Sequence, residues 1–395
     1  MKLLMVSACL PQPSWGASTR NYHLLKALAS RHQVTLVALA NSDEPASASD
    51  LAQLSSFAPT LRVFSRPISS AKRWEQLINV TRGRSYSLNL FILSEVEETL
   101  NAMLTGEHYD AVIYESVLTA GYRLRSKVKV IIDQHNIEHE LVKRTSLVEQ
   151  HWLRKWYARR EYHLLKQGEL ERCRNADLVL VASERESQLL KSMLAEKSIH
   201  VVPNGVDIET FSDDFRQQEV NHQIIFTGAM NYYPNIHAVL FFAQHCWPLI
   251  RAQIPDATWL IVGRKPAPQV QRLAELPGVT VTGEVPDTRP YLAASSLALA
   301  PLLIGSGTRL KILEALAMHK AVVSTSIGCE GLAVVPGRHL MIEDQPEKFA
   351  QAVVALLNDS ERRRALGAAG RALVETEYSW ERCGGQLLHA LEQIG

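Results

Sequence analysis

The sequence predicts an α/β protein built of two doubly wound domains, each a parallel sheet with helices on both faces. Apolar runs of strand length alternate with stretches of helical period. This alternation restarts after VPNGVD, residues 202–207. The 395 residues also suffice for two or three domains of roughly 150 residues each. Both domains are therefore expected to be Rossmann-like.

Five apolar runs are predicted to form the first sheet. An amphipathic stretch at 19–30 separates the first two, as a βα unit requires. Their near-continuous apolar character is typical of strands buried on both faces of a parallel sheet. The five runs are residues 2–10, 33–40, 109–115, 127–133 and 176–183.

Six further runs are predicted to form the second sheet, with helical stretches between them. They are residues 222–230, 257–264, 279–285, 297–303, 321–326 and 339–344. A polar segment, 208–222, lies beside the restart of the pattern. The predicted domains are therefore residues 1–200 and 201–375, and residues 376–395 are expected to form a helix that packs back on the first domain.

The loops that follow strands are the expected place for functional side chains. Open parallel sheets bind ligands at the carboxyl ends of their strands, and two such domains facing one another would enclose an interdomain cleft. The loops concerned are residues 10–19, 133–139, 227–235, 263–268, 282–288 and 304–309.

Charge and cysteine content exclude several classes of protein. Lys plus Arg number 42 against 41 Asp plus Glu, so no global positive field attracts nucleic acid, and an anion site must be built locally. The five cysteines are scattered without zinc-ligand spacing, which is typical of a reducing cytoplasm. No apolar run approaches the roughly 18 residues of a membrane-spanning helix.

The segment 301–332 carries the most informative loop. Gly305 and Gly307, with Ser306 between them, can bring backbone close to a ligand. Thr308 is expected to cap a helix that starts there. The N-terminus of such a helix is an anion-binding site.

Arg309 and Lys311 fall in the first turn of that predicted helix, where the helix dipole disfavours cations. Their presence there favours a bound anion. Glu314 lies further along the same helix, and its carboxylate is suited to accept hydrogen bonds from two sugar hydroxyls. The alternative is an amphipathic helix with a solvated, charged face.

The run IIDQHNIEHE places Asp133, His135 and Asn136 just past a strand end. His135 is predicted to contact the sugar or orient the acceptor, and Asp133 to hold His135. A histidine with a purely structural hydrogen bond is the alternative.

Two further loops carry weaker signals. Gly16 and Ala17 lie between a strand and a helix, where small residues either admit a ligand oxygen at close range or only allow tight packing. Glu330 follows another strand and is predicted to touch the donor sugar. Its alternative is a turn supplied by Gly328 and Gly331.

An ordered set of motifs covers nearly the whole chain: VPNGVD, the TGAMNYYPN loop, WLIVGR, VTGEVPD, the segment 301–332 and a terminal YSWERC. This set resembles the GT4-type, group 1 glycosyltransferases of the GT-B fold, in the subgroup with a GTRLK-type donor loop. The resemblance implies a retaining enzyme that uses nucleotide-sugar donors. It also implies that the second domain binds the nucleoside-diphosphate sugar and the first binds the acceptor.

The resemblance assigns residues and marks two departures. The family's E-x7-E pair falls on Ser306 and Glu314, so the first acid is replaced. The usual Arg and Lys pair is missing from the loop that contains Gly228. We expect Arg309 and Lys311 to take its place as the cations of the diphosphate site.

The predicted function is retaining transfer of a sugar from a nucleoside diphosphate to an acceptor hydroxyl. No Asp-x-Asp motif is present, so neither metal nor cofactor is expected. Arg264 and Lys265 are the second place to seek the phosphate site. Two alternatives stay open: a nucleotide-sugar 2-epimerase of the same fold, and a catalytically degenerate member that binds nucleotide or stabilises a partner.

Residues 143–166 combine basic and aromatic side chains. They are Lys143, Arg144, Arg154, Lys155, Arg159, Arg160 and Lys166, with Trp152, Trp156, Tyr157 and Tyr162. Such a helix can lie at an anionic membrane surface, which would suit a lipid-linked acceptor. Glu149, Glu161 and Glu169 interleave with the cations, and Trp152 and Trp156 at i, i+4 are expected in the core. An ordinary helix is therefore favoured, with peripheral contact at the inner face of the membrane as the alternative.

Overall fold

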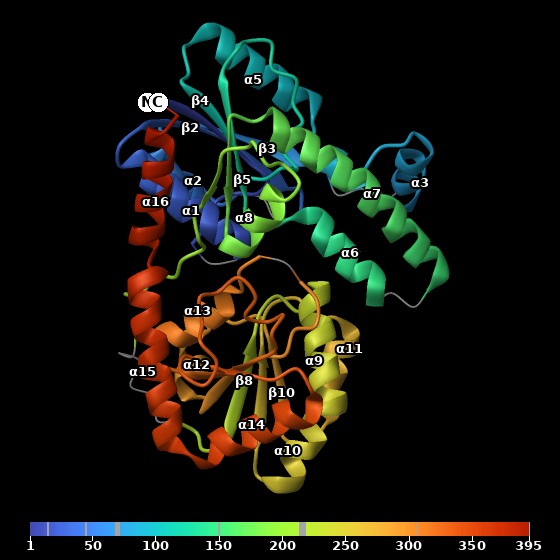
Figure 1. Ribbon diagram of the computed structural model, residues 1–395, viewed down its shortest axis with the longest axis vertical. Helices are drawn as coiled ribbons and strands as arrows, with labels where there is room; N and C mark the ends of the chain where they lie inside the picture. The colour runs from blue at the N-terminus through green and yellow to red at the C-terminus, as the bar shows by residue number, and fades with distance from the viewer. Residues whose placement is uncertain are drawn as a thin grey trace. The chain divides into compact units, whose positions relative to one another are not determined.

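The computed structural model describes residues 1–13, 16–43, 46–67, 72–148, 151–212, 219–305 and 307–394. The chain divides into two compact units. Unit 1 is Met1–Asn204 with Trp380–Gly395, and unit 2 is Gly205–Ser379 (Figure 1). Each unit contains one parallel sheet, so the predicted α/β class with two doubly wound sheets is confirmed.

Unit 1 contains a seven-stranded parallel sheet in the order β3-β2-β1-β4-β5-β6-β7. The strands are β1 (Lys2–Ser7), β2 (Gln33–Asn41), β3 (Thr60–Arg66), β4 (Ala111–Tyr114), β5 (Lys129–Gln134), β6 (Leu178–Val181) and β7 (Ile199–Val201). The strand order reverses between β1 and β4, and ligands of doubly wound sheets bind at such a reversal. The loops after β1 and β4 are therefore at the expected ligand position.

The helices of unit 1 cover both faces of its sheet. They are α1 (Gly16–Ala29), α2 (Ala48–Phe57), α3 (Lys72–Thr81), α4 (Tyr86–Asn89), α5 (Ser94–Gly106), α6 (Glu138–Val148), α7 (Trp152–Asn175), α8 (Glu184–Lys191) and α16 (Trp380–Glu392). Alternate side chains of a strand point to opposite faces. Leu3 and Met5 of β1 accordingly belong to one buried cluster, and Leu4 and Val6 to the other.

Helix α16, from the end of the chain, is part of unit 1. It packs on α1, where the Trp380 ring stacks on His23 with centroids 4.6 Å apart. Gly384 allows this approach, because a Cβ there would lie 2.7 Å from the Cβ of Ala27. The contact ties the two ends of the chain into one core (Figure 1).

Unit 2 contains a six-stranded parallel sheet in the order β10-β9-β8-β11-β12-β13. The strands are β8 (Gln223–Thr227), β9 (Thr258–Val262), β10 (Val279–Gly283), β11 (Leu297–Ala300), β12 (Ala321–Ser324) and β13 (Met341–Ile342). The helices are α9 (Tyr233–His245), α10 (Trp247–Gln253), α11 (Pro268–Gln271), the 3-10 helix η1 (Arg272–Glu275), α12 (Arg289–Ala294), α13 (Leu310–Ala317), α14 (Pro346–Asn358) and α15 (Ser360–Glu377). Here the strand order reverses between β8 and β11.

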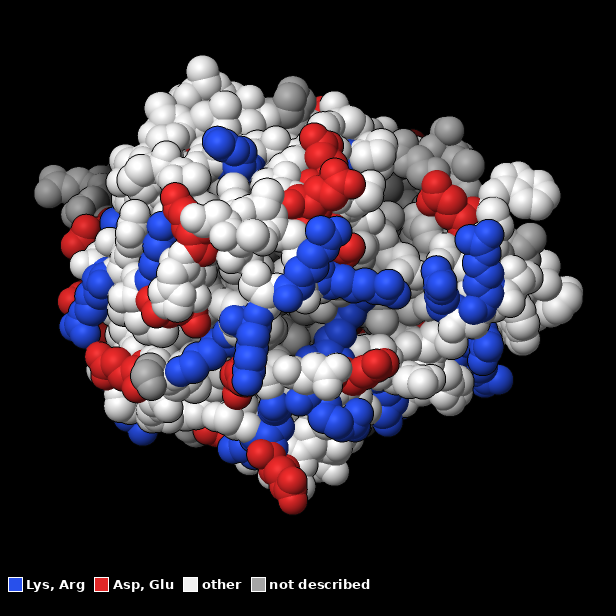
Figure 2. All heavy atoms as spheres, turned by 90° about the horizontal axis from the view of Figure 1, so that it is seen from above, with Lys and Arg blue, Asp and Glu red and all other residues white. Residues whose placement is uncertain are grey.

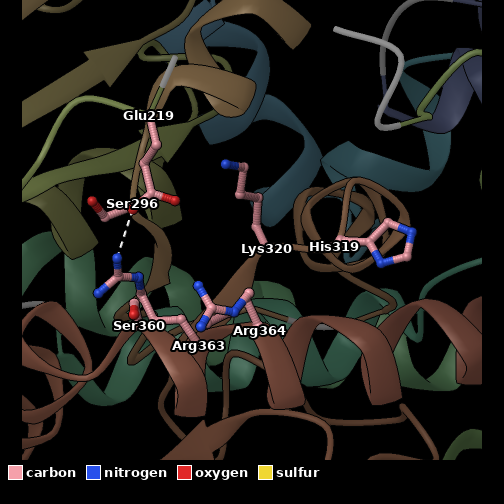
Figure 3. A pocket seen from close by; sticks show the side chains of 8 residues that line it. Glu219, Ser296, His319, Lys320, Ser360, Arg363 and Arg364 are labelled. Carbon is pink, nitrogen blue, oxygen red and sulfur yellow. Dashed lines mark hydrogen bonds and ion pairs between the residues drawn. The ribbon is translucent and has the colours of Figure 1, made fainter. Parts of the chain in front are cut away.

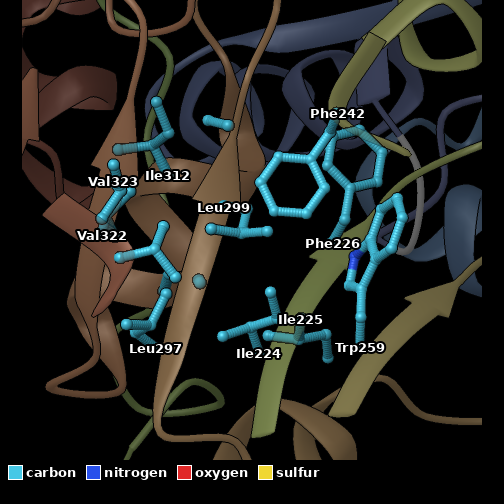
Figure 4. Close-up of a cluster of buried hydrophobic side chains, with 14 of the residues drawn as sticks. Ile224, Ile225, Phe226, Phe242, Trp259, Leu297, Leu299, Ile312, Val322 and Val323 are labelled. Atoms are coloured by element: carbon cyan, nitrogen blue, oxygen red, sulfur yellow. The ribbon is translucent and has the colours of Figure 1, made fainter. Parts of the chain in front are cut away.

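The core of unit 2 packs aromatic side chains against the central strands (Figure 4). Phe242 of α9 meets Trp259 of β9 edge to face, with ring centroids 4.7 Å apart. Phe226 of β8 belongs to the same cluster and is fully buried. Because Phe226 lies one residue before the strand's last position, the core reaches the carboxyl edge of the sheet.

Two strands, β3 and β7, have no counterpart among the predicted apolar runs. β3 is an edge strand in which exposed residues recur between half-buried ones, and β7 has three residues. Neither produces the continuous apolar run of a central strand. All five cysteines are free thiols.

Charged side chains of both signs are interspersed on the face shown in Figure 2, with basic ones gathered towards its middle. This mixture matches the near balance of acidic and basic residues.

Within the described residues, no helix is both long and apolar enough to cross a membrane.

Candidate functional site

Two glycines bring the loops after β8 and β9 into backbone contact. Gly263 has φ +157°, and a Cβ there would lie 1.7 Å from the carbonyl oxygen of Gly228. Gly228 has φ +147°, and its Cβ would lie 2.9 Å from Lys311 Nζ. A side chain at Gly228 would thus occupy the space into which Lys311 extends.

Lys311 projects from the first turn of α13 to the strand reversal. Its Nζ donates to Asn235 Oδ1 at 2.9 Å and lies 3.7 Å from the centroid of the Phe226 ring. Burial lowers the pKa of Lys311 to about 7. A bound anion would stabilise the protonated amine that burial disfavours. The Lys311 side chain is therefore suited to bind a phosphate.

Glu314 follows Lys311 by one helical turn. Burial raises the pKa of its carboxyl to about 7, although Lys311 partly offsets this. Within the described part of the chain, no hydrogen bond to the Glu314 carboxylate is present. It is therefore available to accept hydrogen bonds from a hydroxylated ligand.

The start of α13 differs from the prediction. The helix begins at Leu310 with Arg309 at the N-cap, and no side chain caps it. Thr308 is thus not the cap; its Oγ1 is buried and has no hydrogen-bond partner among the described residues. Of the two predicted cations, only Lys311 lies in the first turn. Ser306 lies outside the described residues.

Arg309 turns back onto its own loop. It is 8% exposed, and its guanidinium donates to the carbonyl oxygens of Gly307 and Ile327. Gly305 has φ +145°, and a Cβ there would lie 2.5 Å from Arg309 Nη2. These contacts make Arg309 a support for its own loop, which follows β11.

The other predicted residues of unit 2 lie in neighbouring loops. Arg264 follows β9, and its carbonyl oxygen accepts from the amide of Met230 at 2.9 Å. Glu330 lies in the turn after β12. In that turn Gly328 is tightly packed, because a Cβ would lie 2.4 Å from the carbonyl oxygen of Ala300.

In unit 1 the strand reversal holds a buried acid beside a histidine. Glu115 follows β4, and its Oε1 lies 3.2 Å from Nδ1 of His135, which follows β5. The amide of Ala8, after β1, donates to Glu115 Oε2 at 3.0 Å. Burial raises the pKa of Glu115 to about 8 and lowers that of His135 to about 4. Near neutral pH the pair therefore consists of a protonated carboxyl and a neutral imidazole.

Asp133 has a different main partner from the one predicted. Both of its carboxylate oxygens accept from the buried Arg20, at 2.6 and 2.9 Å. Arg20 also donates to the Pro203 carbonyl and to Asn204 Oδ1. Asp133 and Arg20 thus connect α1, β5 and the turn after β7, and Glu115 is the carboxylate beside His135.

The remaining predicted residues of unit 1 lie at the same edge of its sheet. Gly16 is the first residue of α1 and Ala17 the second. The hydroxyl of Ser18 donates to the carbonyl of Leu10 at 2.9 Å, which joins the start of α1 to the loop after β1. Asn136 directly follows His135 and is half-buried.

Sequence reasoning missed Glu115, Asn235 and Arg20. For the first two a signal existed, because Glu115 ends the apolar run 109–115 and Asn235 ends the predicted loop 227–235. Arg20 carried no such signal, since it lies inside a helix and its partners are distant in sequence.

A cavity of about 290 Å³ lies at the opposite, amino edge of the unit 2 sheet (Figure 3). Two of its cations, Lys320 and Arg363, are engaged with the protein. Lys320 Nζ donates to the carbonyls of Ala293 and Ser295, and Arg363 pairs with Glu219 at 2.6 Å. We therefore assign it no part in the candidate site. In the described ranges, no group of three His, Cys, Asp or Glu side chains could hold a metal ion.

Family models match most of the chain. The model described as "Glycosyltransferase Family 4" matches residues 16–210, and the model described as "Glycosyl transferases group 1" matches residues 221–359. The chain therefore belongs to the GT4-type group 1 glycosyltransferases.

Two curated relatives are mannosyltransferases. A GDP-mannose-dependent monoacylated alpha-(1-6)-phosphatidylinositol monomannoside mannosyltransferase of Corynebacterium glutamicum is 33% identical over 37% of this chain and 41% of its own length. A phosphatidyl-myo-inositol mannosyltransferase of Mycolicibacterium smegmatis is 28% identical over 49% of this chain and 51% of its own length. The chain thus matches about half or less of these relatives.

Solved structures share the fold over the whole chain. Sucrose-phosphate synthase from Thermosynechococcus elongatus has a TM-score of 0.76 at 17% identity, covering 100% of this chain and 99% of that one. Anabaena HepE, solved with UDP-glucose, has a TM-score of 0.67 at 15% identity, covering 100% of both chains. The two-sheet architecture is that of GT-B glycosyltransferases.

Proposed function

We propose that this protein transfers a sugar from a nucleoside diphosphate to an acceptor hydroxyl, with retention of the anomeric configuration and without a metal. One observation carries the proposal: Lys311, a largely desolvated ammonium, lies at the strand reversal of unit 2 beside Gly228. Membership of the family supports the reaction class. The UDP-glucose complex of the Anabaena neighbour supports a nucleotide-sugar donor.

The donor's diphosphate binds at the N-terminus of α13. Backbone N–H groups there and Lys311 offset the negative charge that grows on the leaving phosphate as the glycosidic bond breaks. Arg309 keeps the Gly305–Gly307 loop in place for this contact. Glu314 accepts hydrogen bonds from a hydroxyl pair of the donor, which we assign to the nucleotide ribose.

The acceptor binds at the carboxyl edge of the unit 1 sheet. A proton on Glu115 Oε1, turned towards Nδ1 of His135 at 3.2 Å, would leave the imidazole's own proton on Nε2. His135 then donates from Nε2 to an oxygen of the acceptor or the transferred sugar. The leaving phosphate takes the acceptor's proton, as the family resemblance implies.

A transfer assay tests this function. UDP-glucose and GDP-mannose, the donors named for the neighbour and the relative, are each incubated with the protein and a panel of hydroxyl acceptors that includes phosphatidylinositol. We expect a glycoside with the donor's anomeric configuration by NMR, formed equally well in EDTA. Loss of transfer in EDTA with rescue by Mg²⁺ would refute metal independence. Epimerised donor without acceptor would favour the epimerase, and binding without turnover a degenerate member.

Glu314→Gln is expected to weaken nucleotide binding by roughly 10- to 100-fold, because a hydrogen bond to a charged group contributes about 1.5–3 kcal/mol. The protein should unfold at an unchanged or higher temperature, since Gln keeps the shape and removes a desolvated charge. Calorimetric titration of wild type and variant measures the change, with Glu347→Gln on the exposed face of α14 as the control. Unchanged affinity would exclude Glu314 from the nucleotide site.

Donor binding should also exchange protons with solvent, in opposite directions at pH 8 and pH 6. At pH 8 Lys311, with its pKa lowered to about 7, is mostly neutral, so the bound diphosphate draws in about one proton. At pH 6 Glu314, with its pKa raised to about 7, is mostly protonated, and ribose hydroxyls that donate to it release a proton. Titration with a nucleotide sugar in buffers of different ionisation enthalpy measures both. Uptake at pH 8 that persists in Lys311→Met would contradict the assignment.

A further inference from the structure

Apolar side chains are exposed mainly on one part of unit 1. Of the eleven large hydrophobic residues exposed among those described, six lie in α3, α6 and α7. They are Trp74, Ile78, Leu147, Trp152, Leu153 and Trp156. Helix α3 packs on α4, α4 packs on α7, and α7 packs on α6 (Figure 1). The exposure therefore belongs to one connected group of helices.

The expectation that Trp152 and Trp156 lie in the core is wrong. Their side chains are 72% and 56% exposed. The positions 152, 156, 159 and 160 are spaced i, i+4, i+7 and i+8, which places them on one face of α7. Arg159 and Arg160 on this face are exposed as well. We call Trp152, Leu153, Trp156, Arg159 and Arg160 the tryptophan–arginine face.

Two of the three acids that interleave with these cations point inward, and the third, Glu149, lies outside the described residues. Glu161 is buried, and its carboxylate accepts from Ser85 Oγ at 2.6 Å and from the amides of Tyr86 and Ser87. Glu169 is fully buried and accepts from the backbone and ring of His139.

The solvent-facing charge on the first half of α7 is consequently positive. Arg154, Arg159 and Arg160 are exposed and Lys155 is half-buried. Among the described residues, none of these four has an ion pair with an acid. A pattern of interleaved cations and acids in the sequence thus becomes, among the described residues, a cationic surface in the fold.

We propose that the tryptophan–arginine face docks on an anionic lipid bilayer. Tryptophan prefers the interface between headgroups and acyl chains, and arginine beside it contacts lipid phosphates while its stem stays in apolar surroundings. Charge complementarity selects this occupant, because an anionic leaflet attracts Arg159 and Arg160, which have no ion pair with an acid among the described residues. A nucleic acid would account for the cations alone and leave Leu147 and Leu153 unexplained. The proposal does not depend on the transfer reaction.

Vesicle binding tests the docking without any assay of activity. The protein is mixed with vesicles of phosphatidylcholine alone or with phosphatidylglycerol, and bound protein is measured by sedimentation. We expect binding only to the anionic vesicles, weakened by added salt. The double variants Trp152→Ser/Trp156→Ser and Arg159→Gln/Arg160→Gln should each bind roughly tenfold more weakly or worse. The control Arg362→Gln/Arg364→Gln removes the same charge from exposed positions of α15 and should bind as wild type does.

A second measurement needs no variant. Lipids brominated along the acyl chain should quench tryptophan fluorescence of the wild-type protein when it is bound to anionic vesicles. Absence of vesicle binding, binding without quenching, or equal binding by the tryptophan and control variants would overturn the proposal. Capture of a protein by this face in the absence of any vesicle binding would overturn it equally.

Discussion

Replacing Lys311 with methionine is expected to lower turnover roughly 10²- to 10³-fold, the usual loss when one preorganised group at a developing anion is removed. Nucleotide affinity should fall much less. Negative charge on the leaving phosphate grows as the glycosidic bond breaks, so a fixed cation stabilises the transition state more than the intact donor. Methionine keeps the length of the side chain and its packing over the Phe226 ring, which isolates the charge.

The measurement is kcat and KM of the variant in the transfer assay, with Lys348→Met on the exposed surface of α14 as the matched control. Arg309→Lys should also reduce turnover, because a point charge cannot make both carbonyl contacts of the guanidinium. Turnover within a few-fold of wild type in both variants, with the fold intact, would mean that Lys311 does not contact the phosphate and that the site does not depend on Arg309. Arg264 and Lys265 would then be the residues to replace.

His135→Ala is expected to lower turnover by roughly 10²-fold, because it removes a positioned hydrogen-bond donor. Nucleotide affinity should stay nearly unchanged, since the nucleotide is assigned to unit 2. The activity of Glu115→Gln distinguishes the two protonation states that the Glu115–His135 pair could have. If Glu115 acts as a protonated carboxyl, the Gln amide can donate to Nδ1 while its oxygen accepts from Ala8, and most activity remains.

Glu115→Ala should lower turnover towards the level of His135→Ala, because it removes the carboxyl that lies beside Nδ1 of the imidazole. His108→Ala, at an exposed position of unit 1, is the control. Equal loss of turnover and nucleotide affinity in His135→Ala would indicate a structural histidine. A large loss in Glu115→Gln would show that the pair acts as a carboxylate and an imidazolium.

The fold was predictable because a buried parallel strand needs a continuous apolar run. β1, β4, β8 and β11 all have such runs, and the rule that ligands bind at the carboxyl edge then pointed to the loops that hold the candidate site. Family resemblance added the reaction class. It did not identify Glu115 as the partner of His135, because that pairing depends on which strands are neighbours in the sheet.

Predictions that depended on side-chain direction fared worse. Thr308 has the right residue type for a cap, yet α13 begins two residues later. Trp152 and Trp156 have the spacing of a buried stripe, yet that stripe faces solvent, and Glu161 fills the inward position. Helical spacing defines which residues share a face, and only tertiary packing decides whether that face is buried.

The central claim is that unit 2 holds a nucleoside diphosphate at Lys311 and Glu314. Its most direct test is the thermal unfolding of the wild-type protein with a panel of nucleosides, nucleoside diphosphates and nucleotide sugars. We predict that at least one diphosphate ligand, at 100 times its dissociation constant, stabilises the fold by roughly 2.7 kcal/mol, while the matching nucleoside has little effect at the same concentration. Equal stabilisation by nucleoside and diphosphate, or no stabilisation by any member of the panel, would contradict the account.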